Sequence, residues 1–200
     1  MKLITVASGK HIDLDNLRME DIDIKDIAHS LSNICRFGGS ARFHYSVAQH
    51  SLYVAGQVAS KHRLWALMHD APEAYYGDVI TPIKHDNRFS LMRDLFEKVD
   101  TIVYRRFGLI SIEDRFSELP VEVREADDAV RMTETDQLME GEPKVKSFKM
   151  AAIVIKKMEP KEAERRFITA WEHCYKKTKN MDAWYPSLSG YNHQGETEDE

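Results

Sequence analysis

Two histidines and one aspartate are the first candidates for chemistry in this chain. His50 lies within an amphipathic segment, and His69 and Asp70 are adjacent at the end of a short apolar segment. Adjacent helical positions point about 100° apart, so His69 and Asp70 can share one ion only if it sits over the helix end between them. Imidazole and carboxylate together suit zinc, manganese, iron or cobalt. A His-Asp pair is common by chance, however, and a single buried histidine is usually an ordinary core residue.

More specific support comes from short sequence blocks on either side of these residues. These blocks are residues 34–39, 45–51, 69–73, 77–78, 81–84, 125–127 and 133–134. Taken in order, the blocks resemble the HD superfamily of phosphohydrolases, and within it the branch that acts on deoxynucleotides. That branch includes bacterial 5′-deoxynucleotidases and phage dATP triphosphohydrolases. The resemblance extends over about residues 24–140.

The resemblance implies a metal-ligand set made of His50, His69, Asp70 and Asp127. Asp127 is preferred over Asp128, which is expected to be a solvated helix charge, because the branch's motif places Ala-Asp a fixed distance before Thr-Glu. Two histidines and two aspartates leave positions on an octahedral ion for water and for a phosphate oxygen. We expect zinc, manganese or cobalt, with magnesium as a candidate for a second ion.

An anionic phosphoester also needs cationic side chains around it. Arg36 is the first candidate, since the equivalent arginine of the resembling enzymes contacts the phosphate. The alternative is a surface arginine that the helix dipole favours at a helix end. Lys84 is a second candidate, and a triphosphate would need further cations, for which His44 and Arg42 are candidates.

Three more residues correspond to functional positions of the resembling enzymes. Phe37 stands where the 5′-deoxynucleotidases carry a tryptophan against the deoxyribose, although it also suits a core position. Glu73, four residues after His69, would share its face on a continuing helix, where it would activate water or protonate the leaving group. The alternative for Glu73 is an exposed residue beside Pro72. Asp78 matches an aspartate near the sugar or the general acid.

The resemblance implies an enzyme that hydrolyses the 5′ phosphoester of a purine deoxynucleotide. Blocks 34–39 and 45–50 look closer to the phage enzymes, which favours dATP as substrate, with deoxyadenosine and triphosphate as products. A 5′-deoxynucleotidase acting on deoxynucleoside monophosphates is the alternative within this class. An alternative from another class is a non-catalytic protein that binds and senses a nucleotide. The complete set of metal ligands together with Glu73 argues against it, because such binding modules often lose one member of the set. Because the resembling enzymes form dimers or larger rings, a homo-oligomer is expected.

The spacing of apolar residues predicts the elements that position these side chains. Helices are expected over residues 23–33, 46–59, 63–71, 89–107, 120–140 and 160–177, with a loop after residue 71. A short β-hairpin is expected near residues 3–12, and no alternation of strands and helices is present. The fold class is therefore all-α, an HD-domain helical bundle over residues 1–180, followed by a polar tail over 181–200.

Composition limits the function classes further. The 200 residues carry a formal charge of −5, which argues against broad nucleic-acid binding. A membrane span needs roughly 20 apolar residues, and neither such a run nor the apolar region of a signal peptide is present. The two cysteines, Cys35 and Cys174, lie far apart and form no CxxC pair. We therefore expect a protein of the cytoplasm, of a bacterium or a phage-infected host, that acts on a small molecule.

Overall fold

The prediction of an all-α fold with a short N-terminal hairpin is confirmed. The computed structural model describes residues 3–84, 86–113, 118–140 and 149–180, so the predicted polar tail over 181–200 lies outside the described residues. The longer elements are β1 (Leu3–Thr5), β2 (His11–Asp13), α1 (Ile24–Asn33), α2 (Val47–Gln57), α3 (Arg63–Met68), α4 (Glu73–Tyr76), α5 (Thr81–Lys84), α6 (Ser90–Arg106), α7 (Val121–Leu138) and α8 (Pro160–Asn180). Single 3₁₀ turns lie at Leu14–Asn16, Met19–Asp21, Ser60–His62 and Asn87–Phe89, and Arg36–Gly39 is a turn with left-handed backbone at Phe37 and Gly38.

The hairpin is fixed to the helices by its turn. β1 and β2 run antiparallel with Ile4 opposite Ile12, and Gly9 takes the positive φ of +85° that the turn requires. The backbone N–H and the hydroxyl of Ser8 both donate to the carboxylate of Asp26 in α1, at 2.6 and 2.8 Å. The short strands therefore rest on a helix instead of standing alone.

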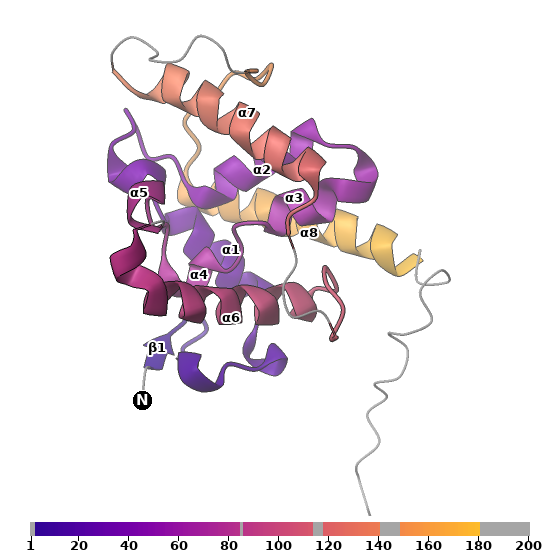
Figure 1. Cartoon of the computed structure of the whole chain (residues 1–200). Coiled ribbons are helices and arrows are strands. Elements are labelled where there is room, and N and C mark those ends of the chain that lie inside the picture. The colour runs from indigo at the N-terminus through magenta and orange to yellow at the C-terminus, as the bar shows by residue number, and fades with distance from the viewer. Residues whose placement is uncertain (1–2, 85, 114–117, 141–148, 181–200) are drawn as a thin grey trace, which may run out of the picture.

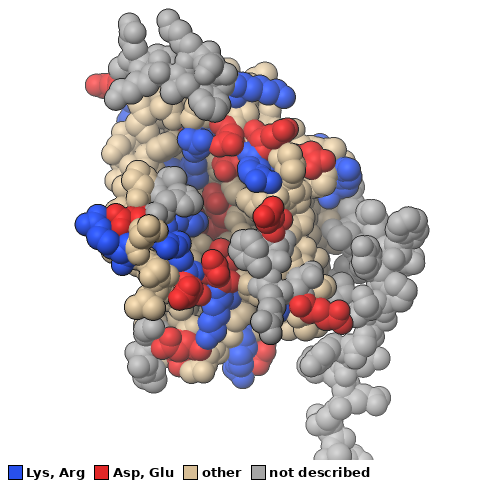
Figure 2. Space-filling view, in the orientation of Figure 1, with Lys and Arg blue, Asp and Glu red and all other residues tan. Residues whose placement is uncertain are grey.

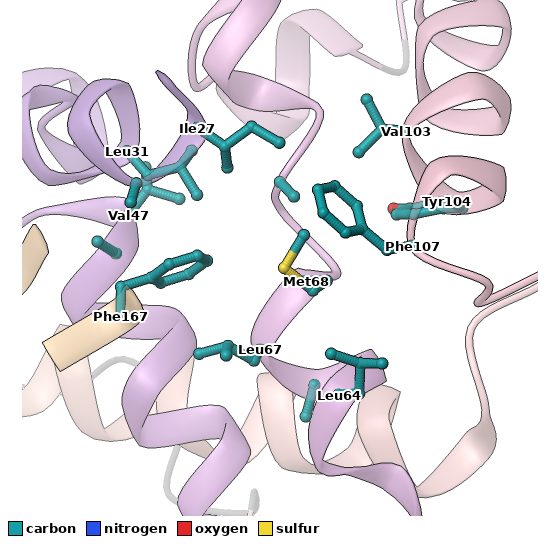
Figure 3. Close-up of a cluster of buried hydrophobic side chains, with 14 of the residues drawn as sticks. Ile27, Leu31, Val47, Leu64, Leu67, Met68, Val103, Tyr104, Phe107 and Phe167 are labelled. Atoms are coloured by element: carbon teal, nitrogen blue, oxygen red, sulfur yellow. The ribbon is translucent and has the colours of Figure 1, made fainter. Parts of the chain in front are cut away.

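Helices α1, α2, α3, α6 and α8 share one apolar core. Phe167 of α8 is fully buried and lies among Leu31 of α1, Val47 of α2 and Leu67 of α3 (Figure 3). Helix α2 packs against α3, α7 and α8, so it is enclosed along much of its length (Figure 1). A residue on the inner face of α2 is consequently shielded from water.

Local sequence signals set the ends of these helices. The side chain of Ser46 caps the N-terminus of α2 by accepting from the N–H of Gln49 at 3.2 Å. Helix α6 ends as predicted at Gly108, whose φ is +68°. The N–H of Gly108 donates to the carbonyl of Arg105, and that of Leu109 donates to the carbonyl of Tyr104, which is the Schellman arrangement.

The segment that carries His69 differs from the prediction. Helix α3 ends at Met68, whereas the sequence predicted a helix over residues 63–71, and the predicted loop contains the one-turn helices α4 and α5. The helix tightens into turns because the N–H groups of Ala71 and Glu73 bond to carbonyls three residues back, and Pro72 has no N–H to offer. His69 and Asp70 therefore lie in a turn between two helices.

The described residues on the face of the molecule shown in Figure 2 carry charges of both signs. Acidic and basic side chains are intermixed across the side of the molecule shown in Figure 2. None of the helices in the described part of the chain is both long enough and apolar enough to cross a membrane.

Candidate metal centre

Side chains from three parts of the fold bring their donor atoms together. His50 comes from α2, His69 and Asp70 from the turn after α3, and Asp127 from α7. His50 Nε2 lies 3.3 Å from His69 Nε2 and 3.0 Å from Asp127 Oδ1, and these three donor atoms all lie within 4.8 Å of one another. Asp70 Oδ2 is 3.6 Å from His50 Nε2 and 3.2 Å from His69 Nε2. His50, His69 and Asp127 thus form a group that can hold a metal ion, with Asp70 beside it.

The group is buried on the histidine side and open on the aspartate side. His50 is completely buried and His69 is 6% exposed, whereas the side chains of Asp70 and Asp127 are 19% and 30% exposed. A ligand from solvent therefore approaches past the two carboxylates.

Hydrogen bonds fix which nitrogen of His69 faces the group. His69 Nδ1 lies 2.7 Å from the carbonyl oxygen of Ala66, and because a carbonyl only accepts, Nδ1 must carry the hydrogen. The lone pair of the neutral ring is then on Nε2, the atom that faces His50 and the aspartates. The hydroxyl of Tyr104 donates to the backbone carbonyl of His69 at 2.6 Å, which holds the turn in place.

His50 is oriented by the buried carboxylate of Glu134. His50 Nδ1 donates to Glu134 Oε1 at 2.5 Å, and Tyr45 donates its hydroxyl to the same oxygen at 2.7 Å. Arg36 Nε donates to Glu134 Oε2 at 3.3 Å. Metal-binding histidines usually donate their other N–H to a carboxylate or a carbonyl in this way. Both histidines satisfy that requirement here.

The electrostatics of the group favour a cation between the rings. Burial and the Arg36 charge lower the pKa of His50, but Glu134 and Asp127 outweigh them and raise it to about 9. Burial likewise lowers the pKa of His69, and the Asp70 charge overcomes that effect and raises it. The carboxylates thus stabilise positive charge at the histidine nitrogens, and a divalent ion would supply such charge in place of protons.

Arg36 lies at the edge of this group and is buried, not on the surface. Besides its bond to Glu134, its Nη1 lies 3.3 Å from Asp70 Oδ2, and its backbone N–H donates to the carbonyl of Tyr45 at 2.9 Å. Phe37 follows it with a φ of +58°, which is unusual for a residue with a Cβ. The guanidinium lies 5.5 Å from the centre of the Phe37 ring.

Glu73 and Asp78 both interact with the charge of Asp70, although Glu73 is not on a continuous helix with His69. Glu73 is 7% exposed, and its Oε2 has no hydrogen-bond partner among the described residues. Burial, together with the charges of Asp70 and Asp78, raises the pKa of Glu73 well above its ordinary value. Burial also raises the pKa of Asp78, while the Lys84 charge opposes the shift at both carboxyls. Lys84 is therefore close enough to act on this side of the centre.

The contacts that the structure gives for His44, Arg42 and Phe37 are with residues other than the four candidate ligands. The ring of His44 is bonded to Cys35 and to the carbonyl of Ser32. Arg42 is exposed and donates to the carbonyl of Met139 after α7 at 3.0 Å. Phe37 is half-buried and packs against a small apolar cluster made of Tyr45, Leu138 and Ile155.

Glu134 is the site residue to which the sequence interpretation assigned no role. It lies seven residues after Asp127, which is two helical turns, so both side chains project from one face of α7. That spacing was visible in the sequence. The hydroxyl of Tyr45 could not be assigned in the same way, because it reaches Glu134 from a segment 89 residues away.

Comparison with other proteins identifies two relatives of this chain. It is 43% identical to the Escherichia coli (strain K12) protein YfdR over 112 residues, which are 54% of this chain and 60% of YfdR. It is 38% identical to the Rhodobacter capsulatus protein RCAP_rcc00048 over 116 residues, again 54% of this chain and 59% of the relative. The chain thus spans about three fifths of the length of these relatives, both described as uncharacterized proteins. No protein-family model matches the chain.

Proposed function

We propose that this protein is a metal-dependent phosphohydrolase that cleaves the 5′ phosphoester of a purine deoxynucleotide. The preferred substrate is dATP, and the products are deoxyadenosine and triphosphate. The observation that carries the proposal is the meeting of two correctly oriented histidines with Asp70 and Asp127, beside a buried arginine and a buried carboxylic acid.

The residues that hold the metal in this proposal are His50, His69, Asp70 and Asp127. Nitrogen and oxygen donors in this mixture suit zinc, manganese or cobalt. When bound, such an ion activates water for attack and withdraws charge from the phosphoryl group.

Arg36 is positioned to bind a phosphate oxygen. Its Nε is occupied by Glu134, which leaves the end of the guanidinium directed at Asp70 on the open side of the centre. Charge that develops on the phosphate is stabilised most by donors that are already fixed in place. Lys84 supplies further positive charge on the side of Glu73 and Asp78.

Glu73 is suited to deliver a proton to the leaving group. Because its pKa is raised, the carboxyl retains a proton at a pH where an exposed glutamate is ionised. The proton sits on a buried acid next to Asp70, and transfer to the 5′ oxygen of the nucleoside completes its departure. Asp78 raises the pKa of Glu73 through its charge and so helps to keep it protonated.

Phe37 is the residue proposed to discriminate deoxyribose from ribose. Its ring lies next to Arg36 and is only partly covered by its apolar cluster. A ring packed on the 2′ carbon leaves a hydroxyl there without a partner, and burying that hydroxyl costs roughly 1–3 kcal/mol.

A product analysis tests the proposed reaction. The protein is incubated with dATP, dAMP and ATP in the presence of manganese, cobalt, zinc or magnesium, and the products are separated by chromatography. We expect deoxyadenosine and triphosphate from dATP and little turnover of ATP. If dAMP releases phosphate while dATP is not hydrolysed, the result would favour the 5′-deoxynucleotidase activity instead. Nucleotide binding without turnover under every metal would contradict catalysis and favour a sensing role.

A further inference from the structure

Cys35 and His44 form a second pair of reactive side chains outside the metal centre. Cys35 Sγ lies 3.1 Å from His44 Nδ1, and His44 Nε2 lies 3.0 Å from the carbonyl oxygen of Ser32. Both residues are half-buried. Neither residue has a role in the proposed hydrolysis.

The bond to Ser32 determines how the two side chains share a proton. Since a carbonyl only accepts, His44 Nε2 carries a hydrogen, and the lone pair of the neutral ring is on Nδ1, facing the sulfur. The thiol of Cys35 therefore donates to Nδ1. If the proton moves to the ring, Nδ1–H donates to the thiolate and Nε2–H still donates to Ser32, so both states are fully bonded. A nucleophile, a base and a group that orients the base are the parts of an activated nucleophile.

The backbone holds the pair in a fixed arrangement. Cys35 pairs with Ser46 as an isolated antiparallel bridge, and the N–H of Arg36 donates to the carbonyl of Tyr45 at 2.9 Å. The segments that carry the cysteine and the histidine are thereby joined directly beside the pair. Ser32 is fully buried in the last turn of α1, so the orienting carbonyl is also fixed.

We propose that Cys35 is a histidine-activated modification site that forms a mixed disulfide with small disulfide-bearing molecules. The sulfur of Cys35 attacks one sulfur of the disulfide, the S–S bond of that molecule breaks, and its other half leaves as a thiolate. The thiol proton passes to His44 Nδ1 and from there to the departing thiolate. Cys35 is oxidised and the departing sulfur is reduced, and excess thiol reverses the exchange. The proposal does not depend on the hydrolytic function.

The two cysteines of the chain allow an internal comparison. The folded protein is treated with oxidised glutathione, and peptide mapping by mass spectrometry follows the adduct at each cysteine with time. Cys174 is half-buried like Cys35, so it serves as the comparison for accessibility. We expect Cys35 to react at least about tenfold faster than Cys174, because His44 Nδ1 lies 3.1 Å from Cys35 Sγ, where it can accept the thiol proton during the attack. Equal rates at the two cysteines would overturn the proposal.

A histidine variant tests the role of the base. His44→Gln keeps a polar side chain but removes the proton acceptor, and we expect it to slow the reaction of Cys35 about tenfold or more. His62→Gln, which removes a histidine paired with Glu122, is the control and should leave the rate unchanged. Thermal melting shows that each variant is folded. An unchanged rate in folded His44→Gln would overturn the proposal, and if that variant does not fold, the comparison of Cys35 with Cys174 decides the question alone.

Discussion

At the scale of single residues, Glu134 links Arg36 to His50 of the candidate metal centre. Its side chain is completely buried, and burial alone would raise its pKa. Bonds from His50, Arg36 and Tyr45 instead keep the pKa below its ordinary value, so the carboxylate stays ionised. A permanent negative charge at this position makes the His50 ring a stronger donor toward a metal.

The substitution Glu134→Gln tests that role. The amide keeps the shape of the side chain but loses the charge, and its NH₂ group would face a donor at His50 or Arg36. We expect cobalt affinity to fall about 10- to 100-fold, as for other groups that orient metal ligands. Titration of the folded protein with cobalt measures this affinity. The control is Asp136→Asn, since Asp136 is an exposed acid on the same helix. Equal affinity in both variants would show that Glu134 does not tune the metal site.

Arg36 should matter for stability as well as for activity. Arg36→Ala removes the guanidinium that bonds Asp70 and Glu134 in a buried setting, and breaking such pairs costs about 3–5 kcal/mol of unfolding free energy. Arg36→Lys should lose less, although a single ammonium cannot bond both carboxylates in the same fork.

Urea denaturation of the metal-free proteins measures the effect of each Arg36 variant. Arg42→Ala is the control, since the side chain of Arg42 is exposed and donates to a backbone carbonyl, that of Met139, where Arg36 bonds carboxylates. If Arg36→Ala and Arg42→Ala are equally stable, the ion pairs of Arg36 contribute nothing to the fold.

At the scale of elements, the turn Arg36–Gly39 is strained where it presents the arginine. Phe37, Gly38 and Gly39 all have positive φ, and the first of them carries a side chain. Strain of this kind persists only where surrounding contacts enforce it, and it is typical of functional sites.

Two glycine-to-alanine substitutions, one in this turn and one in a helix, separate the backbone strain from the general effect of replacing glycine with alanine. Gly38→Ala places a Cβ at φ +59° and should cost about 1–2 kcal/mol of unfolding free energy, with a matching loss of activity as Arg36 shifts. Gly56→Ala lies in helix α2 with open space around it and should stabilise by about 0.5–1 kcal/mol. Thermal and urea denaturation measure both. A stabilising Gly38→Ala would mean that the turn is free to adopt another conformation.

The same scale shows how far the sequence could predict the structure. Apolar spacing located α1, α2, α6, α7 and α8 to within a few residues, because each buries one continuous stripe against the core. It extended α3 too far, since after Met68 the helical bonds give way to bonds three residues back, a change that the apolar spacing does not show. The one-turn helices α4 and α5 are too short to show a period. The bond of Tyr45 to Glu134 was hidden because it depends on tertiary packing.

At the scale of the whole molecule, the candidate metal centre ties together parts of the chain that are distant in sequence. Its donors come from α2, the turn after α3, and α7, which are packed against one another. A ligand that binds only the folded state stabilises it by mass action. The metal should therefore strengthen the packing of these three elements as a unit.

Removal of the metal should lower the melting temperature measurably. An ion at about 100 times its Kd contributes about 2.7 kcal/mol, and for a chain of this size each kcal/mol shifts Tm by about 2–4 °C. We expect a chelator to lower Tm by about 5–10 °C, and added cobalt or manganese to restore it. Asp127→Asn should melt at the same temperature with and without metal, and a full shift in that variant would exclude Asp127 as a ligand.

The central claim is that hydrolysis depends on the metal held by the two histidines and the two aspartates. The most direct measurement is the rate of triphosphate release from dATP, with cobalt or with a chelator, in the wild type, Asp127→Asn and Asp128→Asn. Asp128 is the matched control because it is adjacent, exposed and paired with Arg131. We predict metal-dependent release in the wild type and Asp128→Asn, and a loss of about 100-fold or more in Asp127→Asn. Release that survives the chelator, or equal rates in the two variants, would contradict the account.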